Sequence, residues 1–163
     1  MATSKPLRVF CTQALAAALI ISIFSIPTVV RAASDDDDSQ PASEYSLAKQ
    51  AMDDGDYDVA INKLTALHEE TPGNADVLNL LGYGYRKIGN FDQARGYYLR
   101  ALAAEPKHRG ANAYMGELYL ETSQLEKAEE RLAVLDSDCW LGCSEYTELK
   151  ESIQKYKAEK GIQ

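Results

Sequence analysis

The residues with the clearest chemical potential are two cysteines near the carboxyl end of the chain, Cys139 and Cys143. On a helix, residues four apart share a face with their Cα atoms about 6 Å apart, near the upper limit for a disulfide. Gly142 lies between them and can bend the chain, which makes a bridge easier. We therefore predict a structural disulfide, whose small loop contributes about 2 kcal/mol. A copper site and a redox-active dithiol are the alternatives, although a redox pair usually has the spacing Cys-x-x-Cys.

Two histidines, His68 and His108, are the other candidates for acid–base or metal chemistry. Neither has a cysteine or an HExxH-type partner nearby in the sequence, and both are expected near helix ends. An imidazole there more often interacts with the last carbonyls than with a metal. The chain also has no nucleophile elbow, no Gly-rich phosphate loop and no CxxCH haem motif. These features predict a protein that is not an enzyme and binds no metal or other cofactor.

The first 32 residues indicate the compartment in which the cysteines function. Two basic residues precede an apolar run at 14–26, Pro27 then breaks any helix, and Ala32 offers a small residue at a cleavage position. This order is typical of a secretory signal peptide. The apolar run is shorter than the roughly 20 residues that a membrane-spanning helix needs. We predict that residues 1–32 are cleaved after about Ala32 and that the mature protein is periplasmic or secreted, an uncleaved membrane anchor being the alternative.

Removal of this segment makes the chain strongly acidic. The full sequence has 17 Lys and Arg against 25 Asp and Glu, a net charge of −8. The segment contains three of the basic residues and no acidic one, which leaves 14 against 25 and a net charge of −11. Such a surface repels phosphate backbones and anionic lipid headgroups. We expect no nucleic-acid partner, and no membrane association once the signal is removed.

Residues 33–41 include the run Asp35 to Asp38 between small polar residues. Four like charges in a row cannot bury apolar area, so we predict a disordered acidic leader. A calcium site is the alternative for this run. Calcium loops space their ligands and add a glycine turn, however, and the run does neither.

A 34-residue period organises the chain after the leader. Ala60, Ala94 and Ala128 recur at this spacing, and Pro72 and Pro106 keep the same step. Repeats of this length are the signature of architectures in which each unit packs only against its neighbours. The period therefore indicates a solenoid rather than a single globular core.

The middle unit carries the pattern in full: Leu81-Gly82-x-x-Tyr85, then Ala94-x-x-x-Tyr98, Ala101 and Pro106. Small residues at Gly82 and Ala94 allow two antiparallel helices to approach closely, and the closing proline ends the second helix. The pattern resembles the tetratricopeptide-repeat (TPR) family, in which a leucine-glycine-tyrosine helix is followed by an alanine-aromatic helix.

The resemblance covers about residues 42–140 and implies an all-α fold, an antiparallel helix-pair solenoid of about three TPR units. We place the units at about 41–74, 75–108 and 109–140, with helices near 42–54, 57–70, 75–88, 91–104, 109–122 and 125–136. A seventh helix is predicted at about 144–157, within a cysteine-containing segment, 141–163. Leu149, Ile153 and Tyr156 give it one apolar stripe, which fits a helix that caps the open end of the solenoid.

The resemblance also implies a binding surface, because the first helix of each TPR unit lines the concave face. The corresponding residues here are Tyr45, Lys49, Met52, Asn79, Tyr83, Arg86, Lys87, Ala113, Glu117 and Leu120. Among them, Asn79, Tyr83 and Arg86 could hold an extended peptide: the amide for backbone groups, the ring for apolar contact and the guanidinium for a carboxylate. The lysines and asparagines with which some TPR proteins clamp a carboxyl-terminal tail are not supplied at Gly110 and Ala113.

The sequence thus predicts an exported, non-catalytic adaptor that binds a protein or peptide in its concave groove. An assembly subunit that packs end to end in a periplasmic complex is the alternative. A metal or thiol carrier that uses Cys139 and Cys143 is a third hypothesis.

Overall fold

Several helices begin at polar residues that satisfy free backbone N–H groups. The Asn74 side chain accepts a hydrogen bond at Oδ1 from Val77 N (3.1 Å), and Asn90 caps the next helix in the same way. His108 accepts a hydrogen bond at Nδ1 from Ala111 N (3.1 Å). A side-chain cap of this kind stabilises a helix start by about 1 kcal/mol. These caps fix where the second and third repeats begin.

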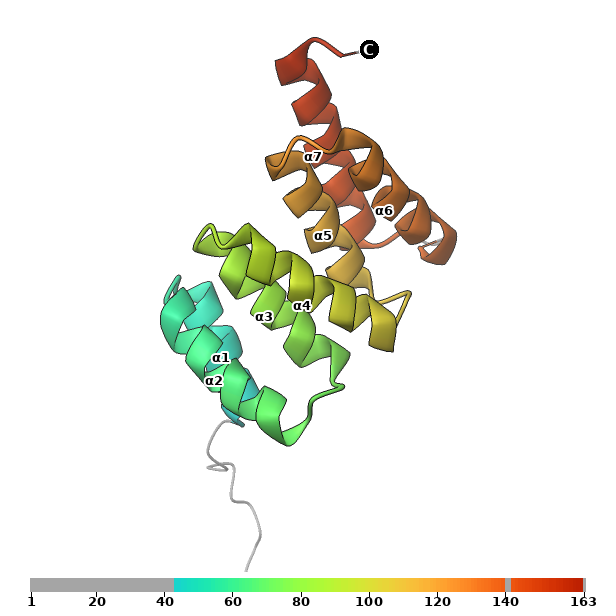
Figure 1. Ribbon diagram of the computed structural model, residues 1–163. Coiled ribbons are helices and arrows are strands. Elements are labelled where there is room, and N and C mark those ends of the chain that lie inside the picture. Colours follow the sequence, from blue (N-terminus) through green and yellow to red (C-terminus); the bar gives the residue numbers. More distant parts are fainter. Residues whose placement is uncertain (1–42, 140–141, 163) are drawn as a thin grey trace, which may run out of the picture. The chain divides into compact units, whose positions relative to one another are not determined.

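The computed structural model describes residues 43–139 and 142–162, all of which lie in one compact unit, Asp38–Gln163. These residues form seven α-helices and no strand (Figure 1). The helices are α1 Glu44–Asp53, α2 Tyr57–Glu70, α3 Ala75–Lys87, α4 Phe91–Ala104, α5 Arg109–Glu121, α6 Leu125–Asp138 and α7 Ser144–Lys160. The predicted all-α fold of paired helices is confirmed, and the helix positions follow the 34-residue period.

The turn inside each helix pair repeats the same backbone conformation. Gly55 and Gly89 have positive φ angles of 82° and 79°, and the third unit has Ser123 in the corresponding place with a φ of 59°. Glycine adopts this region freely because it has no Cβ, whereas a serine there is strained. The turn conformation is therefore imposed by the repeat, even where the residue does not favour it.

Helix pairing in the centre of the unit depends on one close approach. Tyr98 on α4 is fully buried and lies against α3 at Gly82, where an added Cβ would be 2.5 Å from the tyrosine ring. Ala94 and Ala101 on the same face of α4 are also fully buried. This arrangement explains the small residues of the motif, since a larger side chain at any of these positions would separate the helices.

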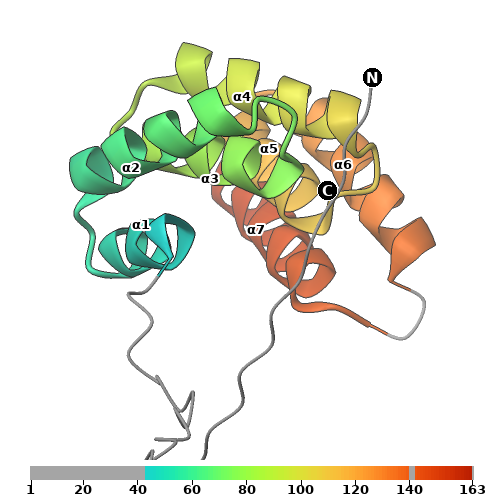
Figure 2. The ribbon, with the colours of Figure 1, turned by 90° about the horizontal axis from the view of Figure 1, so that it is seen from below.

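The seven helices form two rows. Figure 2 shows α1, α3, α5 and α7, which we call the inner row, on one side of α2, α4 and α6. Neighbours within the inner row contact one another, and each outer helix packs against the helix that precedes it. The inner row therefore presents side chains from four helices on one face.

Helix α7 continues the repeat rather than only closing it. Leu149 lies 34 residues after Met115, and Ile153 lies 34 residues after Tyr119. Both α7 residues are buried, in a cluster with Ala128 and Leu135 of α6 and with residues of α5. The predicted capping position is thus occupied by the first helix of a fourth unit, and its remaining surface is mostly polar, as a terminal repeat requires.

The predicted signal peptide (1–32) and acidic leader (33–41) lie outside the described residues. Among the helices that the structure describes, none is both long enough and apolar enough to cross a membrane.

Candidate functional site

Three tyrosines from different helices follow one another along the inner row: Tyr57 at the start of α2, Tyr83 on α3 and Tyr114 on α5. The ring centroids of Tyr57 and Tyr83 are 6.3 Å apart, and those of Tyr83 and Tyr114 are 4.9 Å apart. Lys87 Nζ lies 5.8 Å from the first ring centroid and 5.9 Å from the second. All three rings are half-buried. We call them the tyrosine cluster, an amphipathic surface of the kind common in binding sites.

Arg86 lies beneath this cluster and connects two repeats. It is 8% exposed, and its guanidinium carbon is 5.5 Å from the Tyr83 ring centroid and 5.8 Å from the Tyr114 ring centroid. Its Nη2 is 2.6 Å from Glu117 Oε2, and its Nη1 is 2.6 Å from Glu121 Oε1. Both carboxylates belong to α5, so Arg86 joins α3 to the next inner helix through charge-assisted hydrogen bonds.

The Tyr98 hydroxyl reaches the same guanidinium from the outer row. The hydroxyl is buried without a hydrogen-bond partner, and so is Arg86 Nε. Burial raises the pKa of Tyr98 well above its ordinary value, although the charge of Arg86 opposes the shift. Arg86 is therefore enclosed by a phenol below, two rings above and two carboxylates at its end.

The surroundings of Tyr114 are acidic. Burial raises the pKa of its hydroxyl, and Tyr83, Glu117 and Glu148 raise it further, while Arg86 acts in the opposite direction. Glu148 belongs to α7, so carboxylates from two helices face this tyrosine. One guanidinium and three carboxylates, counting Glu121, leave two excess negative charges at this end of the inner row.

An open cleft of about 440 Å³ continues from Arg86 between α5 and α7. Leu120 and Tyr156 supply apolar surface within it, and Ser123 and Ser152 supply hydroxyl groups. Its charged lining residues are Arg86, Glu117, Glu121, Lys155, Glu159 and Lys160. The cleft can accommodate side chains of an extended chain, which would meet apolar and charged groups in alternation.

The residues predicted from the sequence fall into two groups. Tyr83, Arg86, Lys87 and Glu117 lie together in the tyrosine cluster and around it. Arg86 differs from its predicted role, because two carboxylates of its own chain already bind the guanidinium that we expected to hold a partner's carboxylate.

Asn79, Tyr45 and Lys49 have other surroundings. Asn79 is 7% exposed, its Nδ2 lies against Gly110 between α3 and α5, and its Oδ1 has no partner. Tyr45 on α1 is half-buried, and burial and the charge of Asp76 raise its pKa. Lys49 is exposed on the same helix. These three positions line the inner row away from the cleft.

Sequence reasoning missed Tyr114, Glu121, Glu148 and Tyr156. The last two were accessible from the period, because extending the 34-residue step by one more unit places α7 in the inner row. Tyr114 and Glu121 adjoin repeat positions that the motif does not specify, and only the distance from Arg86 or from Tyr83 identifies them.

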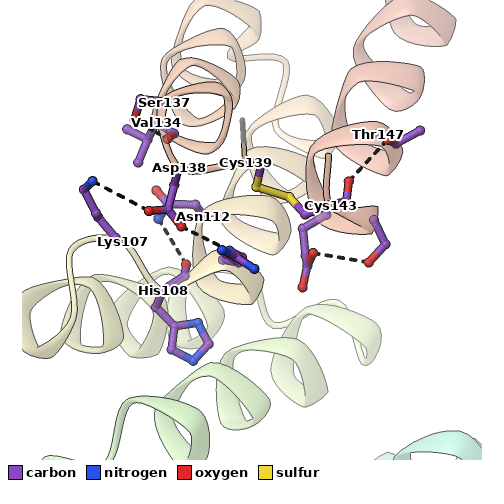
Figure 3. Close-up of a disulfide and its surroundings, with 12 residues drawn as sticks. Lys107, His108, Asn112, Val134, Ser137, Asp138, Cys139, Cys143 and Thr147 are labelled. Atoms are coloured by element: carbon purple, nitrogen blue, oxygen red, sulfur yellow. Dashed lines mark hydrogen bonds and ion pairs between the residues drawn. A yellow bond between two sulfur atoms is a disulfide. The ribbon is translucent and has the colours of Figure 1, made fainter. Parts of the chain in front are cut away.

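Cys139 and Cys143 are joined by a disulfide in the structure, with Cα atoms 5.5 Å apart. Cys139 caps the end of α6 and Cys143 precedes α7, so the bridge closes the loop between these helices (Figure 3). Beside it, Asp138 accepts a hydrogen bond from Arg109, which lowers the pKa of the aspartate. Within the described ranges, no group of three or more His, Cys, Asp or Glu side chains is placed to hold a metal ion.

The tetratricopeptide repeat family model matches the sequence twice, over residues 51–100 and 89–138. No curated protein sequence matches.

Solved structures share the helix arrangement. The type III secretion translocator chaperone SycD of Yersinia enterocolitica is 21% identical, with 73% of this chain and 84% of that chain covered and a TM-score of 0.63. PcrH in complex with the chaperone-binding region of PopD is 18% identical, with coverages of 72% and 90% and a TM-score of 0.63. MamA is 22% identical, with coverages of 76% and 72% and a TM-score of 0.63. At these identities the likeness shows the fold.

Proposed function

Because the chain belongs to the tetratricopeptide repeat family, we propose that it is an exported, non-catalytic scaffold that binds a protein segment along its inner row. The observation that carries this proposal is the convergence of Tyr83, Tyr114 and Tyr156, from three successive inner helices, on one open cleft beside Arg86. Partly buried aromatic residues of this kind supply large contact area at little cost in side-chain entropy.

Three structural neighbours support a peptide as the ligand. Besides PcrH with its PopD region, SycD has been solved with a peptide of the translocator YopD, and the first TPR of Spaghetti (RPAP3) with the HSP90 peptide SRMEEVD. The fold they share with this chain accommodates segments of other proteins. Their ligands differ in sequence, so the proposal extends to this chain the mode of binding and not the ligand.

Export rests on the amino-terminal pattern and on the cysteines. A cleaved segment ending near Ala32 would deliver the chain to an oxidising compartment, where Cys139 and Cys143 remain bridged. Mass spectrometry of the protein from its native host should find a chain that begins near Ala33 and lacks two thiol hydrogens. An intact amino terminus with two free thiols would contradict export.

Peptide binding can be tested with a display library of random peptides of about 12 residues, which span about 40 Å when extended. Selected peptides should bind the mature chain, and Tyr83→Ala together with Tyr114→Ala should raise their Kd at least about tenfold. Leu99→Ala is the matched control, because Leu99 is exposed (51%) on the outer helix α4. Circular dichroism would verify that each variant is folded.

Two results would contradict the scaffold. Peptides insensitive to the tyrosine changes would place binding elsewhere. Mass that rises with concentration, unaffected by those changes, would favour the end-to-end assembly instead. The described ends offer that assembly little apolar surface: Lys63 and Glu44 form an ion pair (3.0 Å) between α1 and α2, and the outer face of α7 is mostly polar.

A further inference from the structure

The charge that surrounds Arg86 is the reverse of what its guanidinium suggests in isolation. Glu117 and Glu121 each contact it at 2.6 Å, so its positive charge is neutralised twice. A partner's carboxylate that approached Arg86 would also approach both glutamates and be repelled by them. This end of the groove therefore disfavours acidic side chains.

The tyrosine cluster reinforces this preference. Tyr83 and Tyr114 are tilted by 48° with centroids 4.9 Å apart, and aromatic faces attract cations. Glu148 of α7 is close enough to Tyr114 to raise the pKa of its hydroxyl, as Glu117 also does. A cationic side chain placed on the exposed part of these rings would meet both the aromatic surface and carboxylates from α5 and α7.

Cations on the far wall of the cleft do not cancel this field. Lys155 Nζ lies 4.0 Å from a carboxylate oxygen of Glu159, and Lys160 Nζ lies over the Tyr156 ring at 5.8 Å from its centroid. These lysines offset Glu159 at the carboxyl end of α7, so the excess negative charge is concentrated at the tyrosine end. Residues 43–163 as a whole carry 14 basic against 21 acidic residues, a net charge of −7, which attracts cations over longer distances.

We infer that the segment bound in this groove is basic, with a Lys or Arg side chain on Tyr83 and Tyr114 facing Glu117, Glu121 and Glu148, and an apolar side chain on Leu120 and Tyr156. This inference rests on the proposed peptide binding and specifies its ligand class. Arg86 then holds two carboxylates in position for the partner's cation and does not itself contact a partner's carboxylate.

The random library also tests the ligand class. Among selected peptides that require Tyr83 and Tyr114, Lys and Arg should be enriched over the unselected library and Asp and Glu depleted. Binding of these peptides should weaken as salt is raised, because the contributing charges are partly exposed. Groove-dependent peptides that are acidic, or that show no charge bias, would overturn the inference and leave the proposed function standing. Failure to select any groove-dependent peptide would overturn both.

A matched pair of charge reversals separates the local field from net charge. Glu148→Lys removes the excess negative charge at the tyrosine cluster and should raise the Kd of a selected basic peptide about fivefold. Glu130→Lys, at an exposed position on α6, changes the net charge equally and should leave the Kd unchanged. An equal effect of both variants would assign the preference to net charge and contradict a site at the cluster.

Discussion

Two glycines at the same position of successive repeats accommodate different neighbours. At Gly82 an added Cβ would be 2.5 Å from the ring of Tyr98, which belongs to α4, the second helix of the same repeat. At Gly116 the Cβ would be 2.6 Å from a methyl carbon of Leu149, which belongs to α7, the first helix of the next unit. The third repeat has Leu132 where the second has Tyr98, and Leu132 is only partly buried.

The difference shows that the central repeat completes its own packing, whereas the third repeat needs α7. In the centre, a rigid and fully buried ring fills the space between two helices of one pair. At the carboxyl end, a flexible side chain from a terminal helix fills it, and that helix is attached through the loop that the disulfide closes. We expect the centre to unfold as a whole and α7 to be separable, because terminal elements of a solenoid contact one neighbour only.

The largest effects should come from truncating the two side chains that cover these glycines. Tyr98→Ala should destabilise the protein by about 4 kcal/mol, and Leu149→Ala by about 3 kcal/mol, since both side chains are fully buried. Hydrogen exchange should show lost protection throughout the inner and outer rows for Tyr98→Ala, and mainly in α7 and the facing part of α5 for Leu149→Ala. Uniform loss of protection in both variants would refute the separability of α7.

The positions that make up this comparison were accessible from the sequence to different degrees. Gly82, Tyr98 and the helix bounds follow from contacts between residues close in sequence, which the repeat motif specifies. The contact between Gly116 and Leu149 requires the period to be extended to a fourth unit.

The charge state of Arg86 could not be predicted in this way. Its partner Glu121 is 35 residues distant, and whether a helix-surface arginine is free or bound depends on the angle between repeats. No local pattern encodes that angle. The sequence therefore located the binding surface but gave its central residue the wrong ligand, because Glu117 and Glu121 already occupy the guanidinium.

The disulfide offers a second way to weaken the carboxyl end alone. Replacing Cys139 and Cys143 together by Ser should cost about 2 kcal/mol, the loop-closure entropy of a short loop. Denaturant unfolding should then show an earlier loss of α7, with the transition of the central repeat unchanged. Reduction of the wild-type protein is the matched control and should reproduce the effect. A double variant as stable as wild type would mean that Leu149 and Ile153 suffice to hold α7.

The glycines themselves should respond unequally to a single methyl group. Gly82→Ala should destabilise by about 1–2 kcal/mol, because the rigid Tyr98 ring cannot move aside and the cost exceeds the gain in helix propensity. Gly116→Ala should be within about 0.5 kcal/mol of wild type, since the Leu149 methyl groups can rotate away and alanine favours the helix. Thermal unfolding of both variants measures the difference, and equal destabilisation would show that α7 packs as rigidly as α4.

The smallest effect at neutral pH is expected from the one polar atom of the central ring. Tyr98→Phe removes a buried hydroxyl that has no hydrogen-bond partner, so the variant should be as stable as wild type or up to about 1 kcal/mol more stable. Peptide binding should be unchanged, because Arg86 separates this hydroxyl from the tyrosine cluster.

The same variant becomes informative in alkali. Because burial raises the pKa of Tyr98 above its ordinary value of 10.0, the folded protein keeps a proton that the unfolded chain loses near that pH. Wild-type stability should therefore fall as pH rises above about 10, and Tyr98→Phe should fall less steeply there. Tyr114→Phe, at a half-buried position where carboxylates and burial also raise the pKa, is the control and should have a smaller effect. Identical alkaline profiles for wild type and Tyr98→Phe would mean that the central ring is not enclosed, and the contrast with the carboxyl end would disappear.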